Sequence, residues 1–257
     1  MFQDLKIRFF EEGYFITPFP SKIVSEMQNY VEYNIRDIWK DYFRCDCNLE
    51  EAIELIPNSE WSEKMGRFTR MFPVRIAGQL QDWTETFVRN VFGVKRTAVG
   101  VVYKQEAKLN QALREESKAI YYRFVRPGRL DVGRAHRECD FWMVEYSDGY
   151  DPKIPFDFDY HQDCVKFWIP ISGCTSETSI QIIPKSHKME IPTAVVMTEY
   201  GRRPSITDDW VKEHEQDFIS PIEEGSCLVF HMGLVHRGPV NRNNRIRISA
   251  EITIAVQ

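Results

Sequence analysis

Residues 223–254 read EEGSCLVFHMGLVHRGPVNRNNRIRISAEITI, and this stretch decides the predicted fold. Two runs within it are rich in β-branched and aromatic residues, which is the composition of β-strands. The polar segment between them contains Asn243-Asn244, a turn signal. We therefore expect two strands, residues 227–232 and 246–256, joined by a polar connection.

Four more runs of the same kind precede this stretch. Each is short and rich in β-branched and aromatic residues, and turn signals such as Arg126-Pro127-Gly128 and Ser147-Asp148-Gly149 separate them. The runs are residues 119–125, 140–146, 165–171 and 179–184. A series of short strands with turns between them favours a sandwich or a barrel.

The first part of the chain has helical periodicity instead. Ser21 can cap a helix whose apolar residues recur at helical spacing. A second helix is expected after Pro73, with Gly93 as its stop. Residues 1–118 are thus expected to form a mainly helical layer and residues 119–257 a β core, in one domain that covers the whole chain, 1–257.

Composition excludes several classes of protein. With 257 residues and 43% hydrophobic content, the chain can bury one sizeable core. Its formal net charge of −5 is unlike the basic footprint of a nucleic-acid-binding protein. No apolar run approaches the roughly 18 residues of a membrane span. The six cysteines include no CxxC pair, and the start lacks the regions of a signal peptide, so we expect a cytoplasmic protein with reduced thiols.

The C-terminal stretch also carries the sharpest chemical signal. His236 lies at the start of the return to the last strand, and Arg247-Ile248-Ser249 follows it. Side chains of residues two apart on a strand lie on the same face, so Arg247 and Ser249 can bind the same ligand. A guanidinium beside a hydroxyl suits the distal carboxylate of a dicarboxylic cofactor, and a neutral imidazole at His236 can bind ferrous iron.

An iron centre of this kind needs a second histidine and a carboxylate, which complete a two-His-one-carboxylate set with open positions. Two pairs in the sequence can supply them: His136 with Glu138, and His161 with Asp163. On a strand, either spacing sets the imidazole and the carboxylate on one face. The second pair has the more common form, His-x-Asp, and the residues alone leave both pairs open.

Several runs of the sequence resemble the phytanoyl-CoA dioxygenase family, particularly its small bacterial members. The resemblance extends from about Tyr121 to Val256, and FFEEGYFITPFPSKIVSEMQNYV at residues 9–31 is similar to the family's N-terminal helix. The matching runs are YYRFVRPGRLDVGRAHRECDFW, VKFWIPI, SIQIIPKSHK, GSCLVFHMGLVHRGPVN and RISAEITI. One departure is Lys185 in SIQIIPKSHK, where the family generally has glycine.

The resemblance implies a mainly β fold with α, in which a double-stranded β-helix (jelly roll, cupin-like) core has the N-terminal helices packed on one side. It also implies an oxygenase that uses Fe(2+), 2-oxoglutarate and dioxygen to oxidise a small-molecule substrate, most simply by hydroxylation, with release of succinate and carbon dioxide. Arg247 and Ser249 would then bind the oxoglutarate.

For the metal, the resemblance favours His136 and Glu138 together with His236, because the acidic-Val-Gly turn typical of the family precedes this pair. Glu138 departs from the usual aspartate by one methylene. His161 and Asp163 stay as the alternative, since the string YHQD is itself common in the family.

The departures from the family pattern at Glu138 and Lys185 leave two other functions open. One is a β-helix binding protein that has lost catalysis, and the other is a cupin-type metalloenzyme that does not use oxoglutarate. Arg247-x-Ser249 counts against the second, because such enzymes need no dicarboxylate anchor. A group of basic residues near the predicted site indicates an anionic or polar substrate, with a small polar metabolite expected, or else forms a solvated basic face. These residues are Arg123, Arg126, Arg129, Arg134 and Arg137.

Overall fold

The computed structural model describes residues 1–31, 74–75, 78–99, 119–128, 134–141, 159, 161–198, 201–222 and 225–257. Among the described residues of the N-terminal part, the helices are α1 (Phe2–Glu12), α2 (Ser21–Tyr30) and α6 (Gly78–Phe92). Glycine ends α1 and α6, since Gly13 (φ 85) and Gly93 (φ 70) take the left-handed conformation that disfavours other residues.

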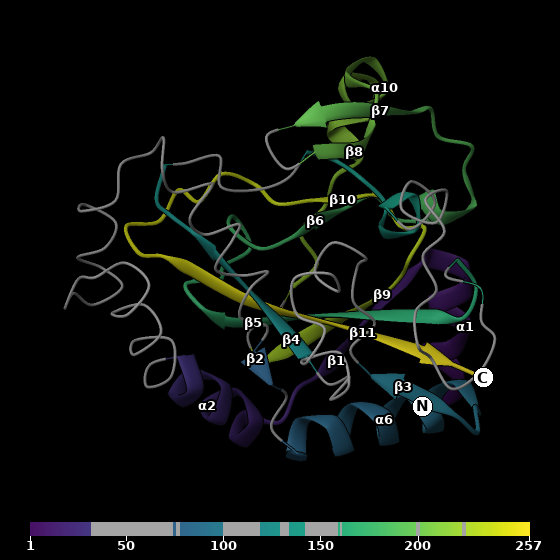
Figure 1. Cartoon of the computed structure of the whole chain (residues 1–257), viewed down its shortest axis with the longest axis vertical. Coiled ribbons are helices and arrows are strands. Elements are labelled where there is room, and N and C mark those ends of the chain that lie inside the picture. The colour runs from purple at the N-terminus through teal and green to yellow at the C-terminus, as the bar shows by residue number, and fades with distance from the viewer. Residues whose placement is uncertain are drawn as a thin grey trace.

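A large antiparallel sheet forms the centre of the molecule, with the strand order β1-β9-β5-β11-β4-β2 and with β3 also paired to β11. In this order the strands are β1 (Tyr14–Pro18), β9 (Ser226–His231), β5 (Cys164–Ser172), β11 (Arg247–Val256), β4 (Ala119–Val125) and β2 (Val74–Arg75), and β3 is Thr97–Val99. Figure 1 shows α2 and α6 along one side of this sheet and the remaining strands on the other.

The two faces of β11 have different roles. Ile248, Ala250, Ile252 and Ile254 pack into one core with the apolar residues of the three helices. Alternate residues of a strand point to opposite faces, so the residues between them, beginning with Arg247, point away from the helices. One face of β11 therefore packs in the apolar core with the helices, and the other face carries the side chains that begin with Arg247.

A second, smaller layer covers that other face. It contains the pairs β6 (Gln181–Ile182) with β10 (His236–Arg237) and β7 (Thr193–Thr198) with β8 (Gly201–Ile206), and the short helices η2 (Ser186–Lys188), α10 (Asp208–Glu213) and η3 (Glu215–Asp217). A second apolar cluster fills the space between the layers. Its buried members are Trp168, Ile180, Ile182, Leu228, Phe230 and Leu234.

Most of the predicted strands are present. Residues 119–125, 165–171, 227–232 and 246–256 correspond to β4, β5, β9 and β11, whereas 179–184 contains only the two residues of β6. The N-terminal part is not purely helical, because β1, β2 and β3 join the large sheet. No described helix is both long and apolar enough to cross a membrane.

Two local predictions are wrong. Ser21 is not a cap but the first residue of α2, which has Pro20 at its N-cap and no side-chain cap, because proline already fixes the backbone angle there. The run 140–146 does not begin as a strand: Asp140 and Phe141 belong to a helical turn. The rest of that run, Trp142 to Tyr146, lies outside the described residues.

Candidate metal and cofactor site

His136 and His236 face each other across an antiparallel bridge. The backbone N–H of His136 donates to the carbonyl of His236 at 3.1 Å, and the N–H of His236 donates to the carbonyl of His136 at 3.0 Å. Residues that exchange both hydrogen bonds are directly opposite, with their side chains on the same face. The two imidazoles consequently lie side by side, with 4.3 Å between ring centroids.

Backbone carbonyls set the tautomer of both rings. Nδ1 of His136 lies 2.6 Å from the carbonyl oxygen of Arg134, and Nδ1 of His236 lies 3.0 Å from that of Leu234. A carbonyl oxygen only accepts, so each Nδ1 carries the hydrogen and each Nε2 keeps its lone pair. Such a contact orients an imidazole for metal binding through Nε2.

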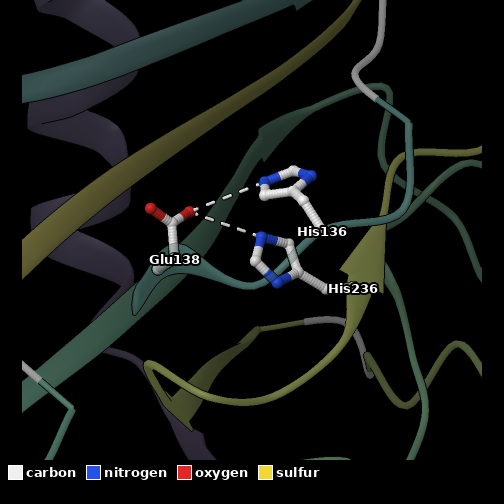
Figure 2. Close-up of side chains that lie close together, drawn as sticks. All are labelled: His136, Glu138 and His236. Atoms are coloured by element: carbon white, nitrogen blue, oxygen red, sulfur yellow. Dashed lines mark ion pairs between the residues drawn. The ribbon is translucent and has the colours of Figure 1, made fainter. Parts of the chain in front are cut away.

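The two Nε2 atoms converge on one carboxylate oxygen. Oε1 of Glu138 lies 3.3 Å from Nε2 of His236 and 3.9 Å from Nε2 of His136, as Figure 2 shows. The three ligand atoms lie within 4.8 Å of one another, and among the described residues no other group of three potential ligands does so. Metal bonds of about 2.1 Å at right angles place ligand atoms about 3 Å apart, so this set fits a divalent metal with small adjustments.

Glu138 reaches this position from a helical turn. His136 and Glu138 were expected on one strand face, but residues 138–141 are helical. The turn is fixed by the side chains of Arg137 and Asp140, 2.7 Å apart at their closest, and by the Cys139 N–H, which donates to the Met232 carbonyl at 3.1 Å. The strand interpretation of this pair is therefore wrong, although the two side chains do meet.

A buried lysine contacts the same carboxylate oxygen of Glu138. Nζ of Lys166, on β5, lies 2.6 Å from Oε1 of Glu138 and 3.1 Å from Oε2 of Glu251, on β11. Arg123 then pairs with Glu251 through two contacts of 3.2 and 3.3 Å. The Lys166 side chain is only 4% exposed, so each of its charge partners matters for the cost of burial.

Burial and these charges shift the pKa values of the candidate ligands. Burial acts to raise the pKa of Glu138, the ammonium group of Lys166 is the largest opposing influence, and the net shift is downward. For His136, burial and then the neighbouring His236 lower the pKa well below the usual range. At neutral pH the site therefore offers a neutral His136 imidazole and an ionised carboxylate, the protonation states that metal binding needs.

Arg247 and Ser249 lie on the same face of the sheet as this cluster. Both are buried, and on β11 they share a face with Glu251, which contacts Lys166. The Arg247 guanidinium donates from Nη1 to the Thr178 carbonyl. Its Nε and the Ser249 hydroxyl have no hydrogen-bond partner among the described residues, which is the arrangement expected of a polar site for an anion.

The alternative pair is not arranged as a ligand set. His161 lies beside His231, with 5.0 Å between ring centroids. The Asp163 carboxylate instead accepts the N–H of Asp159 at 2.9 Å and closes a turn. Of the four candidates for the first half of the site, the structure brings His136 and Glu138 to His236 and places His161 elsewhere.

Lys166 and Glu251 were missed as parts of the site. Lys166 is the single charged residue in the apolar run VKFWIPI, and a lysine inside a buried strand is rare unless it is paired. That signal was present in the sequence, but its partner Glu138 is 28 positions away. No local pattern joins the two.

The basic residues near the site are engaged in ion pairs. Besides Arg123 with Glu251, Arg134 pairs with Asp208 at 3.3 Å and Arg137 with Asp140. Arg126 is buried, and Arg129 lies outside the described residues. The interpretation of these arginines as a solvated basic face fails for the buried Arg126 and for Arg137, whose side chain is 16% exposed, whereas Arg123 and Arg134 are exposed.

The comparisons with known proteins concern the family of the chain and its fold. The sequence profile of the phytanoyl-CoA dioxygenase (PhyH) family matches residues 82–249. No curated protein sequence matches at a significant level.

Solved structures are similar in fold. One is the epimerase SnoN in complex with Fe3+, alpha ketoglutarate and nogalamycin RO: 10% identity, 99% of this chain and 83% of that chain covered, TM-score 0.52. Another is the non-heme monooxygenase ThoJ in its apo form: 13% identity, 98% and 77% covered, TM-score 0.51. A third is the non-heme alpha ketoglutarate dependent carbocyclase SnoK from nogalamycin biosynthesis: 10% identity, 98% and 83% covered, TM-score 0.51. These likenesses confirm the predicted fold class.

Proposed function

Because this chain belongs to the phytanoyl-CoA dioxygenase family, we propose that it is an iron(II)- and 2-oxoglutarate-dependent oxygenase that hydroxylates a small polar metabolite. The observation that carries the proposal is the convergence of two Nε2 lone pairs and one carboxylate oxygen within 4.8 Å. Two neutral imidazoles and one carboxylate form the ligand set of non-haem iron oxygenases, which leaves positions open for other ligands.

In this proposal each polar residue has one task. His136, Glu138 and His236 hold the metal, and the Arg134 and Leu234 carbonyls orient the two imidazoles. Arg247 and Ser249 bind the distal carboxylate of oxoglutarate.

The unpartnered Arg247 Nε and Ser249 hydroxyl support the cofactor role, because buried polar atoms are seldom left without a hydrogen bond. Bound iron and oxoglutarate would supply the oxidising chemistry, in which dioxygen is consumed and oxoglutarate becomes succinate and carbon dioxide. The chain's contribution is to orient these groups and to exclude water around them.

A polar substrate is favoured over a lipid chain by the charged groups around the metal ligands. Lys166 contacts Glu138, Glu251 contacts Lys166, and the Arg137–Asp140 pair belongs to the same turn as Glu138. A long apolar chain would leave such groups poorly solvated. The family name is not evidence for a coenzyme A thioester, because one fold hosts many substrates.

The test is turnover of the cofactor. Protein loaded anaerobically with ferrous iron is expected to consume oxoglutarate slowly on exposure to air, to release succinate, and to do so faster when a polar substrate is present. A protein that bound metal but neither bound nor consumed oxoglutarate would be a cupin-type metalloenzyme of another kind. One that bound oxoglutarate without any turnover across a panel of polar metabolites would be a binding protein, and either result would overturn the proposal.

A further inference from the structure

Three buried polar atoms without a hydrogen-bond partner come from the same part of the fold. They are Nε of Arg247, Oγ of Ser249 and Oγ of Ser179; the fourth such atom among the described residues, Nδ1 of His187, lies elsewhere. An unpartnered buried donor or acceptor destabilises the folded protein, because it has lost its hydrogen bonds to water. Three together indicate a ligand that completes their hydrogen bonds.

Ser179 directly follows the residue that contacts the Arg247 guanidinium. Nη1 of Arg247 donates to the carbonyl of Thr178, the residue before Ser179. Backbone geometry then keeps the Ser179 hydroxyl within about 7 Å of the guanidinium. Ser179 is 0% exposed, so its hydroxyl faces the protein interior and not solvent.

The turn that carries Ser179 is rigid. The Ser179 N–H donates to the Thr175 carbonyl at 2.8 Å, and the Thr178 hydroxyl accepts the Thr175 N–H at 2.9 Å and donates to the Gly173 carbonyl at 3.0 Å. A side chain on such a turn is held in place before any ligand binds, which reduces the entropy lost on binding.

The same turn is fastened to the beginning of β11. Cys174 Sγ lies 3.3 Å from the Ile248 carbonyl, and a Cβ on Gly173 would lie 2.5 Å from the Ile246 carbonyl oxygen. The contact with Arg247 is therefore one of several that hold the turn and the strand together. Ser179 and Ser249 approach the guanidinium from two separate elements.

We propose that Ser179 is a third binding residue for the distal carboxylate of 2-oxoglutarate, together with Arg247 and Ser249. A carboxylate has two oxygens and about four lone-pair sites, which is more than one guanidinium edge can satisfy. Because Nη1 is engaged with Thr178, the edge formed by Nε and Nη2 is the one that can meet the carboxylate, and the two hydroxyls can donate to its remaining lone pairs. The inference rests on the proposed function and adds to it a determinant of specificity for a dicarboxylate.

The experiment compares two ligands on protein loaded with Mn(II) without dioxygen, by calorimetry. The first ligand is 2-oxoglutarate and the second is 2-oxobutyrate, which keeps the 2-oxo acid but lacks the distal carboxylate. Ser179→Ala is expected to weaken binding of 2-oxoglutarate about tenfold and to leave binding of 2-oxobutyrate unchanged. Ser220→Ala is the matched control, because it also removes a serine hydroxyl, one that donates to the Ile180 carbonyl at 3.2 Å; its 2-oxoglutarate affinity is expected to equal that of the wild type.

Thermal unfolding of the ligand-free protein gives an independent readout. Removing an unpartnered buried hydroxyl also removes the cost of burying it without a hydrogen bond, so the Ser179→Ala variant is expected to be at least as stable as the wild type. It is expected to gain less stability than the wild type when 2-oxoglutarate is added.

The outcomes separate the two proposals. Unchanged 2-oxoglutarate affinity in Ser179→Ala, or equal losses for both ligands, overturns the role of Ser179 and leaves the proposed function standing. A wild-type protein that binds neither ligand, or both equally, overturns the proposed function and the role of Ser179 with it.

Discussion

Nζ of Lys166 and Oε1 of Glu138 lie 2.6 Å apart in the protein interior. The oxygen that the lysine contacts is the same atom that faces Nε2 of His236 and of His136. A metal bound to these histidines would share this oxygen with the ammonium group. Lys166 therefore neutralises Glu138 when the metal is absent and repels a divalent cation when it is present, by several kcal/mol at an effective dielectric constant of about 20.

Replacing Lys166 by methionine is expected to tighten metal binding at least tenfold, because Glu138 then keeps its full charge for the metal. The metal-free variant is expected to be less stable by about 3–5 kcal/mol, since breaking a buried ion pair leaves a charge without its partner. Calorimetric titration with Co(II) and urea unfolding measure the two effects.

Lys185→Met is the control for Lys166→Met, because Lys185 pairs with Glu12 at 3.3 Å on the surface, where an ion pair contributes little. Its metal affinity is expected to be that of the wild type. Weaker metal binding in Lys166→Met would mean that the lysine mainly positions Glu138 and that charge repulsion is the smaller effect.

The choice between the two candidate metal pairs predicts a pattern among four alanine variants. Removing one of three protein ligands abolishes tight binding, so His136→Ala and Glu138→Ala are expected to lose the metal. His161→Ala and Asp163→Ala are expected to keep it, since the Asp163 carboxylate closes a turn at Asp159. Each variant is checked for folding by circular dichroism, and loss of iron from Asp163→Ala with retention by Glu138→Ala would reverse the assignment.

The large sheet was predictable because its strands carry their own signal. β5, β9 and β11 are buried on both faces, and their runs of β-branched and aromatic residues are recognisable without any knowledge of the neighbours. The second layer was harder. β6 and β10 have two residues each, and segments that short are specified by their partners more than by their own sequence.

In the candidate site, His236 and Arg247 could be proposed from the sequence because they lie in one continuous stretch, and their roles stay predictions. The contact of Glu138 with Lys166 was not predictable, because it depends on how a helical turn packs on a distant strand. Ser179 carried no chemical signal at all. Its hydroxyl becomes informative only when its burial and its lack of a partner are known.

Arg247→Ala is expected to weaken oxoglutarate binding by about 2–5 kcal/mol, well over tenfold, with little change in metal affinity. Arg247→Lys is expected to restore little, because an ammonium cannot reproduce the planar fork of a guanidinium. Arg245→Ala is the control: Arg245 lies on the same stretch but is exposed, so calorimetry should find nearly normal binding. A larger effect at Arg245 than at Arg247 would contradict the assignment of the anchor.

Lys185 is the one non-glycine residue with positive φ among the described residues, at 66°. The position is the one at which the sequence departs from the family's usual glycine, and the left-handed conformation costs a residue with a Cβ roughly 1–2 kcal/mol. Lys185→Gly is therefore expected to raise the free energy of unfolding by roughly 1 kcal/mol, after allowance for the surface pair with Glu12. Lys188→Gly, in η2 and without positive φ, is expected to lower it, and urea unfolding distinguishes the two; a loss of stability in Lys185→Gly would contradict the strain argument.

Three histidines gather away from the metal site. His231 is buried, and its ring centroid lies 5.0 Å from those of His161 and His187. Nδ1 of His231 accepts the Gly233 N–H at 3.0 Å, which fixes its neutral form. A Cβ on Gly233 would lie 2.9 Å from Nε2 of His161, so the imidazoles leave no room for a side chain there. Burial, and then His187 and His161, lower the pKa of His231 to about 3.

This cluster predicts a loss of stability in mild acid. The ordinary pKa of histidine is about 6.5, so above that pH His231 is neutral in both the folded and the unfolded chain. Below it the unfolded chain binds a proton that the folded protein does not, and stability falls until about pH 3. Between pH 8 and pH 5 this residue is expected to lower the free energy of unfolding by about 2 kcal/mol. His231→Asn keeps an acceptor for the Gly233 N–H but does not titrate. Between pH 8 and pH 5 the free energy of unfolding of this variant is therefore expected to fall by about 2 kcal/mol less than that of the wild type. Urea unfolding of both proteins measures this difference, and a chelator removes any contribution from bound metal. Equal losses of unfolding free energy in the two proteins would contradict the prediction, because they would mean that protonation of His231 does not destabilise the folded protein.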